Sequence, residues 1–353
     1  MSDSRPWLTR PEIARSLRLA VAFLAPVAIG VGVHHALTGL LIGIGAFMVA
    51  NADLGESYAQ RLRLMVPAAL AIAGMMAAGM ATGRSKARTV AVGVAVFLLA
   101  GLAASLGREA ALFSTFAAFA YVIGTGLAVS PGLTIFGVVW PVLAGGALAL
   151  VLSAVNAGLV QHPADEPPEP WRSLPHRARQ RLDRKLVRHA LALAIAGGIA
   201  LAIVPATHQS NGAWLVTGAL LVLKPGYHDT VQTALVRAGA TVVGAAAAAG
   251  ITAGISQRWA LIVAAFLLTW AAAAVIGHSF AAFVVFITPL SILLTNVLVP
   301  GDWRVAYLRV ADVACGSAIA IVVAVILHVV LPDAQAASPA AAPDAAAQPN
   351  EPV

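Results

Sequence analysis

Apolar stretches alternate with short polar segments along nearly the whole chain. The stretches hold long runs of Ala, Leu, Val and Gly and lack the period of two that is typical of barrel strands. Because backbone amides must be hydrogen-bonded inside hydrocarbon, each membrane-crossing stretch of this kind forms a helix. The pattern predicts an all-α membrane protein with about twelve transmembrane helices of roughly 20 residues. The expected spans are residues 17–33, 36–50, 63–82, 89–106, 110–128, 133–157, 189–205, 211–223, 231–254, 259–276, 279–298 and 305–331.

The polar positions of this pattern occur twice, with a shift of 173 positions, the distance from His35 to His208. The same shift aligns Arg188 with Arg15, Gly212 with Gly39, Gly218 with Gly45, and Asp229-Thr230 with Glu56-Ser57. These matches predict two homologous halves with about six spans each. Since six is even, both halves cross the membrane in the same sense, which predicts two parallel pseudo-symmetric six-helix repeats.

Four segments follow from this pattern: a first membrane repeat at 1–157, a Pro- and Arg-rich linker at 158–187, a second repeat at 188–331 and a tail at 332–353. The Ala- and Pro-rich tail is expected to be disordered. Arginines crowd the N-terminus and the linker, which places both on the cytoplasmic side. We expect a multi-pass protein of the bacterial inner membrane with cytoplasmic termini. The basic segment 83–88 would then face outward, as an exception or because the third and fourth spans are misplaced.

Composition narrows the function. The chain is 60% hydrophobic and only 10% charged, with a mean hydropathy of +0.87, which identifies an integral membrane protein. Its net charge of +7 lies in membrane-flanking segments, so lipids rather than nucleic acids are the expected partners. We find no nucleophile elbow, phosphate-binding loop or metal-ligand spacing, and expect no enzyme activity, cofactor or metal. A membrane acyltransferase using His228-Asp229 is the weaker alternative, because adjacent helical residues do not share a face.

The spans 36–50 and 211–223 are shorter than the roughly 20 residues that a membrane crossing needs. They hold equivalent places in the two halves. Short segments at corresponding positions indicate a transport site, because helix ends within the membrane expose unpaired backbone groups and dipole ends. The alternative is that both helices are complete and that their boundaries are misplaced.

A polar turn follows each short span. Ser57 and Thr230 are each preceded by an acid, Glu56 and Asp229, which suits the start of the next helix. There a hydroxyl bonds free amides and a carboxylate meets the positive end of the helix dipole. Capping therefore explains these residues without a substrate.

Capping does not explain Arg63 and Arg237, which lie near the first turns of the following helices. A permanent charge at this depth is costly unless it faces a cavity or a partner. Two interpretations stay open: contact with an anion, which a guanidinium suits, or a structural ion pair with Asp53, Glu56 or Asp229.

Arg309 and Asp312 lie three residues apart in the last span, the spacing of a helical ion pair. A self-neutralising pair is the simpler interpretation, and a proton-coupling carboxylate is the alternative.

The segment 223–244 has a Lys-Pro turn at Lys224, followed by Thr230, Arg237 and Gly244. This spacing after a short span resembles the fusaric acid resistance protein-like family, and residues 51–63 resemble a diverged copy of it. The resemblance extends over roughly 15–331. It implies inner-membrane efflux of aromatic or other amphipathic carboxylic acids, in some relatives with a periplasmic adaptor. Many relatives carry large soluble regions after each membrane half, whereas this chain has the linker and the tail, so an adaptor partner stays open.

The leading hypothesis is an ion-gradient-driven exporter of small organic anions, because the sequence holds no nucleotide-binding motif. The candidate substrate-binding residues are Arg63, Arg237, Lys224, Thr230 and Tyr227, and the candidate coupling residues are Asp53, Glu56, Asp229 and Asp312. The alternative is an anion channel or a membrane scaffold subunit without a transport cycle. Substrate identity, coupling ion and homo-oligomerisation are left open.

Overall fold

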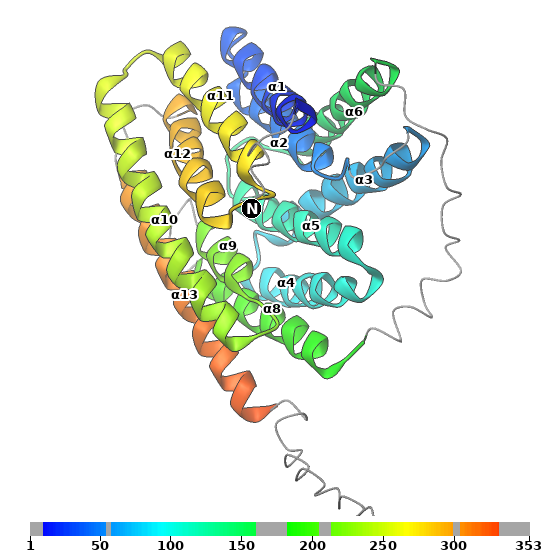
Figure 1. The fold of residues 1–353 in the computed structure, drawn as a ribbon, viewed down its shortest axis with the longest axis vertical. Helices are drawn as coiled ribbons and strands as arrows, with labels where there is room; N and C mark the ends of the chain where they lie inside the picture. Colours follow the sequence, from blue (N-terminus) through cyan, green and yellow to red (C-terminus); the bar gives the residue numbers. More distant parts are fainter. Residues whose placement is uncertain (1–9, 54–57, 160–181, 205–212, 299–303, 332–353) are drawn as a thin grey trace, which may run out of the picture.

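The computed structural model describes residues 10–53, 58–159, 182–204, 213–298 and 304–331. This part of the chain is all-helical, with twelve α-helices, one 3₁₀ helix and no strand (Figure 1). The first half contains α1 (Arg10–Gly32), α2 (Ala36–Ala50), α3 (Tyr58–Thr82), α4 (Lys86–Leu102), η1 (Ala103–Leu106), α5 (Arg108–Leu127) and α6 (Ile135–Leu159). The second half contains α8 (Arg184–Ile203), α9 (Ala213–Val222), α10 (Tyr227–Gly254), α11 (Arg258–Val275), α12 (Phe280–Leu298) and α13 (Arg304–Val330).

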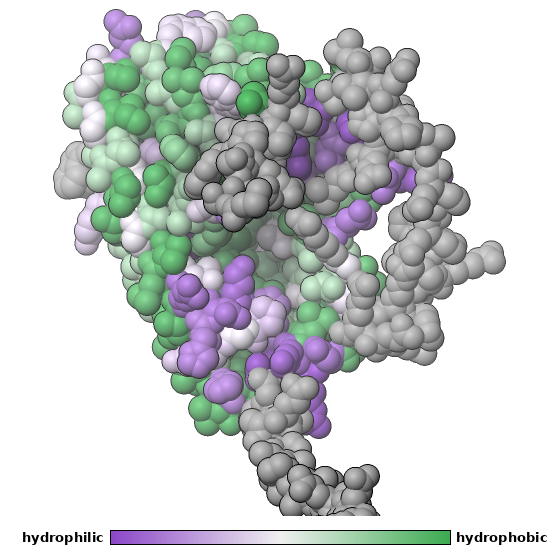
Figure 2. Space-filling model, viewed as in Figure 1, coloured by the Kyte–Doolittle hydropathy of each residue, from purple (hydrophilic) through white to green (hydrophobic). Residues whose placement is uncertain are grey.

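Ten of these helices are long and apolar enough to cross a membrane, whereas α2 and α9 are shorter. At 1.5 Å per residue, α2 is about 22 Å long and α9 about 15 Å, against roughly 30 Å of hydrocarbon. The all-helical prediction is therefore confirmed, while a count of twelve full crossings is not. Exposed apolar side chains cover much of the visible surface, as expected for a lipid-facing protein (Figure 2).

The predicted spans begin too late in places. α1 begins at Arg10 and α3 at Tyr58, where spans were expected from 17 and 63. Hydropathy marks the part of a helix that suits hydrocarbon, whereas the backbone hydrogen bonds continue through the polar ends. The third and fourth spans are present as α3 and α4; residues 83–85 of the basic segment join them, and its residues 86–88 form the first turn of α4.

Glycines set the closest helix crossings. Gly45 of α2 and Gly145 of α6 each lie directly against the backbone of the partner helix, where a Cβ would not fit. Gly218 of α9 and Gly316 of α13 make the corresponding crossing in the second half. Small residues allow this approach where lipid provides no hydrophobic drive for association.

The two halves follow one packing scheme. In the first half α2 packs on α1 and α6, and α3 packs on α5 and α6; in the second, α9 packs on α8 and α13, and α10 packs on α12 and α13. The halves meet through two contacts, α4 against α8 and α1 against α11. In both contacts, the first helix of one half packs on the fourth helix of the other half. The scheme is what parallel repeats would produce, and the repeat itself stays a prediction, as do the segment boundaries. The predicted tail and most of the linker lie outside the described residues.

Candidate functional site

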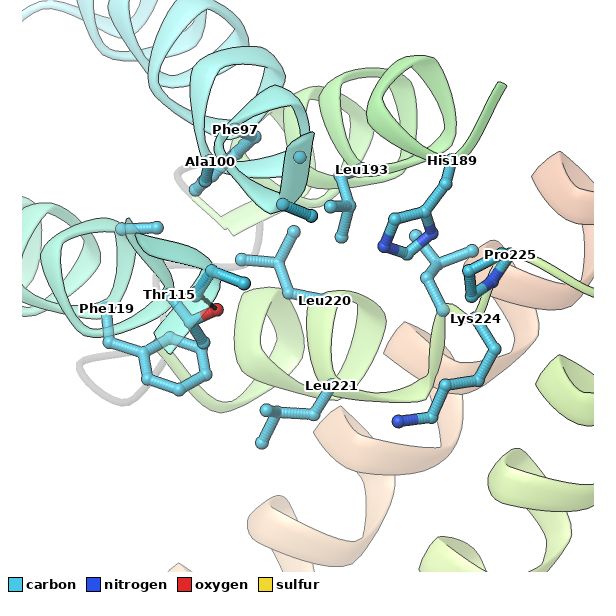
Figure 3. Close-up of a pocket in the computed structure, with 15 residues that line it drawn as sticks. Phe97, Ala100, Thr115, Phe119, His189, Leu193, Leu220, Leu221, Lys224 and Pro225 are labelled. Atoms are coloured by element: carbon cyan, nitrogen blue, oxygen red, sulfur yellow. Dashed lines mark hydrogen bonds between the residues drawn. The ribbon is translucent and has the colours of Figure 1, made fainter. Parts of the chain in front are cut away.

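A cavity of about 350 Å³ lies between α4, η1, α5, α8 and the end of α9 (Figure 3). Its walls are mostly apolar, and its polar groups are Thr115, His189 and Lys224. The remaining lining residues are Phe97, Ala100, Gly101, Ala104, Ala111, Ala118, Phe119, Leu193, Leu220, Leu221, Leu223 and Pro225. His189, Lys224 and Pro225 lie at one end, and Thr115 and Phe119 lie at the other (Figure 3). The cavity thus has an apolar body and a basic end.

Small residues between α4 and α5 leave room for this cavity. The α4 helix tightens into η1, and Gly107 then adopts φ 124°, a conformation that residues with a Cβ rarely reach. The chain therefore reverses directly into α5, and Ala104 and Ala111 on either side of the glycine line the same space. The Ser114 hydroxyl donates to Ala100 O at 3.1 Å and ties the two helices together.

The turn between α9 and α10 holds Lys224 at the basic end. The Thr230 hydroxyl accepts from Lys224 N–H at 3.0 Å and donates to Gly226 O at 2.9 Å. Arg188 of α8 donates to Pro225 O at 3.2 Å and to Leu331 O at 3.0 Å. Thr230 is fully buried, so its hydroxyl stabilises the turn, and the structure gives it no exposed surface for a substrate.

The side chain of Lys224 is exposed, and its ammonium lies 5.9 Å from the ring centroid of Phe280. No carboxylate in the described part of the chain forms an ion pair with it. The C-terminal end of α9 lies beside it, and the negative end of a helix dipole favours a cation there. Lys224 therefore offers an available positive charge to the cavity.

Aromatic and basic side chains extend this end of the cavity. Tyr227 stacks on His328 of α13 with centroids 5.8 Å apart, and its ring lies 5.0 Å from that of His228. A smaller neighbouring pocket is lined by Arg188, His189, Lys224, Tyr227 and His328, among others. Hydrophilic residues gather in the lower part of Figure 2, around the ends of α8, α10 and α13. Asp229 is exposed in the first turn of α10, where the dipole favours it.

In the first half, the turn after α2 is an ion-pair network. Asp53 accepts from Arg18 at 2.7 Å and from the Ser153 hydroxyl at 3.1 Å, and Arg61 Nε lies 3.4 Å from its second oxygen. Among the described residues, the partners of Asp53 are thus Arg18 and Arg61 rather than Arg63. Arg63 itself is exposed on α3. Glu56 and Ser57 lie outside the described residues.

Arg63 and Arg237 do not meet in a shared crevice. Arg63 lies on α3, which packs on α5 and α6, whereas Arg237 is buried on α10, which packs on α12 and α13. The ion pair expected between Arg309 and Asp312 is also not formed among the described residues. The guanidinium carbon of Arg309 lies 3.6 Å from the ring centroid of Trp214 on α9, because the side chain turns toward that helix.

Several residues at these sites were not predicted from the sequence. One of them is His189, the residue after Arg188. Its Nδ1 is buried without a hydrogen-bond partner among the described residues. Arg18, Arg61 and Trp214 were missed as well, and only the charge of the two arginines could have drawn attention to them. The apolar cavity walls carry no signal in a sequence in which apolar residues are everywhere.

Residues 199–323 match the model of the fusaric acid resistance protein-like family. The matched region runs from α8 to α13 and includes Lys224, Thr230 and Arg237, so the predicted family resemblance is confirmed there. No curated protein and no solved structure gives a significant match to the chain. The family match and the ten membrane-length helices together indicate a multi-pass membrane protein with a transporter-like role.

Proposed function

We propose that this chain, whose second half carries a fusaric acid resistance protein-like region, exports small amphipathic organic anions such as aromatic carboxylic acids. The observation that carries the proposal is the apolar cavity with Lys224 and His189 at one end. Its volume of about 350 Å³ falls in the range of small-molecule sites, roughly 300–1,000 Å³. The apolar walls and the positive charge together support this substrate class.

The two parts of such a substrate match the two parts of the cavity. An aromatic ring gains from burial against Phe97, Phe119 and the leucines of α9. A carboxylate gains a charge-assisted hydrogen bond from Lys224, whose ammonium has three donors. His189 lies beside Lys224 at the same end of the cavity.

Ion-gradient coupling is part of the proposal. Among the four carboxylates suggested by the sequence, Asp53 is engaged in the first-half network and Asp229 is exposed. Asp312 is buried, and its Oδ2 has no hydrogen-bond partner among the described residues. A buried carboxylate within a membrane helix suits a proton carrier, so we propose Asp312 for this role before the others. Inner-membrane location, cytoplasmic termini and any adaptor or self-association stay expectations.

The test is flux in proteoliposomes with a panel of aromatic acids under an imposed pH gradient. We expect wild-type protein to accumulate an acid against its own gradient and Lys224→Gln to lower the initial rate about tenfold. A tenfold loss equals about 1.4 kcal/mol, within the range for a hydrogen bond to a charged group. Lys86→Gln is the matched control, because Lys86 is an exposed lysine at the start of α4, away from the cavity.

Two outcomes would count against the proposal. If no acid moves in response to the gradient, the chain does not work as this exporter, and a scaffold subunit is favoured. If acids only equilibrate down their gradient, the chain is an anion channel. One observation favours these alternatives: Asp53, a candidate coupling residue, is held in an ion-pair network, as expected for a structural element.

A further inference from the structure

A second group of charged residues lies away from the cavity, where α9, α10 and α13 meet. Arg237 of α10 is 5% exposed, and Arg309 and Asp312 of α13 are 4% and 3% exposed. Trp214 of α9 covers Arg309. None of these four residues lines the cavity that holds Lys224. The three charges sum to +1, because the group contains two guanidiniums and one carboxylate.

The donors of both arginines are incompletely used. Arg237 Nε, Arg309 Nε and Arg309 Nη1 are buried and have no hydrogen-bond partner in the described part of the chain. Guanidinium donors lie in the plane of the group, whereas the Trp214 ring covers its face at 3.6 Å. Stacking therefore stabilises the charge of Arg309 and leaves its in-plane donors for another acceptor.

Asp312 does not complete the group. It lies one helical turn after Arg309 on α13, yet no ion pair joins these two residues, and Asp312 Oδ2 has no hydrogen-bond partner among the described residues. A buried charge without a counter-charge is strongly unfavourable, and buried cations normally meet an anion. A single negative charge would balance this group, and an anion that accepts hydrogen bonds through oxygen or as a halide could supply it.

We infer that Arg237 and Arg309 form a binding site for a compact monoanion, held between α9, α10 and α13. The anion accepts hydrogen bonds from the unpartnered guanidinium donors and brings the group to neutrality. Trp214 orients Arg309, and Asp312 limits the affinity by its negative charge. A halide and the carboxylate of a small organic acid share this chemistry, and this site does not depend on the exporter proposal.

Full-length protein in lipid nanodiscs tests the inference by thermal unfolding. Sodium chloride replaces sodium gluconate at constant ionic strength, so that screening is unchanged and only the compact anion varies. We expect the melting temperature of wild-type protein to rise and saturate with chloride. Arg309→Gln and Arg237→Gln should abolish the saturable rise. Arg63→Gln, which changes an exposed arginine, should retain it.

Asp312→Asn provides a test that keeps both arginines. Removal of the negative charge raises the net charge of the group from +1 to +2, so the half-saturating chloride concentration should fall about tenfold. The inference is overturned if wild-type protein does not respond to chloride, if the response persists in both arginine variants, or if Asp312→Asn leaves the half-saturating concentration unchanged.

A benzoate arm separates the two sources of the anion. If benzoate raises the half-saturating chloride concentration in Lys224→Gln as in wild-type protein, an organic carboxylate occupies this site. If benzoate has no effect on the chloride response, the site is selective for the halide. Loss of transport in the flux experiment with an intact chloride response would reject the exporter proposal and leave this site standing.

Discussion

The turns that follow the two short helices occupy equivalent places and are built in opposite ways. After α2, Asp53 neutralises Arg18 and accepts from Ser153, so its charge is consumed inside the protein. After α9, backbone groups take the hydrogen bonds of Thr230, and Lys224 keeps an available charge beside a cavity. In the described residues, the carboxylate after α2 is therefore engaged in ion pairs, whereas the turn after α9 has a lysine beside a cavity, which suits an anion.

The arginines of the first helix in each half show the same difference. Arg18 of α1 reaches a carboxylate in its turn, while Arg188 of α8 reaches the carbonyl oxygen of Pro225. An ion pair fixes a turn and cancels its charge, whereas hydrogen bonds to carbonyls fix a turn and leave it positive. The turn after α9 therefore offers a basic end to a cavity, whereas the carboxylate after α2 is engaged by Arg18.

The largest expected effect comes from breaking the first turn. Asp53→Asn removes the buried carboxylate that pairs with Arg18 and faces Arg61, and it should cost about 3–5 kcal/mol of stability. SDS-induced unfolding followed by circular dichroism measures this loss. Asp229→Asn is the matched control, because Asp229 is exposed and should change stability by no more than about 0.5 kcal/mol. Equal effects of the two substitutions would show that the Asp53 network does not stabilise the fold.

A smaller effect is expected at the helix crossings that support the two turns. A Cβ at Gly45 would meet the backbone of Val142, and Gly45→Ala should therefore destabilise by about 1–3 kcal/mol. The Cβ of Gly218→Ala would lie 3.1 Å from the Val313 backbone, so a smaller loss is expected there. Gly74 has no neighbour within 4 Å, and Gly74→Ala should be neutral or slightly stabilising in the same unfolding assay. A greater loss at Gly218 than at Gly45 would contradict this ranking.

The smallest effect is expected in the second turn. Thr230→Val removes the hydroxyl that pairs with the amide of Lys224 and should cost about 1 kcal/mol. Flux should fall as well, since Lys224 loses its fixed position. Thr230→Ser retains the hydroxyl and should preserve both stability and flux. If the valine variant transports at the wild-type rate, the turn does not position Lys224.

The sequence was informative where the residue types alone decide the local structure. Long apolar runs predicted the helices, and the Lys-Pro turn with Thr230 identified the family region. It did not decide the charge pairing: Arg63 was considered as a partner of Asp53, whereas Arg61 faces Asp53 in the structure. Residues two positions apart on an α-helix differ by about 200° in direction, so the choice between Arg61 and Arg63 depends on how α3 is rotated against its neighbours.

The sequence by itself determined that this is a helical membrane protein with two short helices at matching places and a basic turn after the second. Hydrophobicity and backbone hydrogen bonding act locally, so these features can be read from consecutive residues. Only the tertiary structure decided that Lys224 and His189 face one cavity, and that Arg237 and Arg309 are buried on packed helices with Trp214 stacked on Arg309. Those arrangements require helices from distant parts of the chain to pack at defined rotations, which no local pattern specifies.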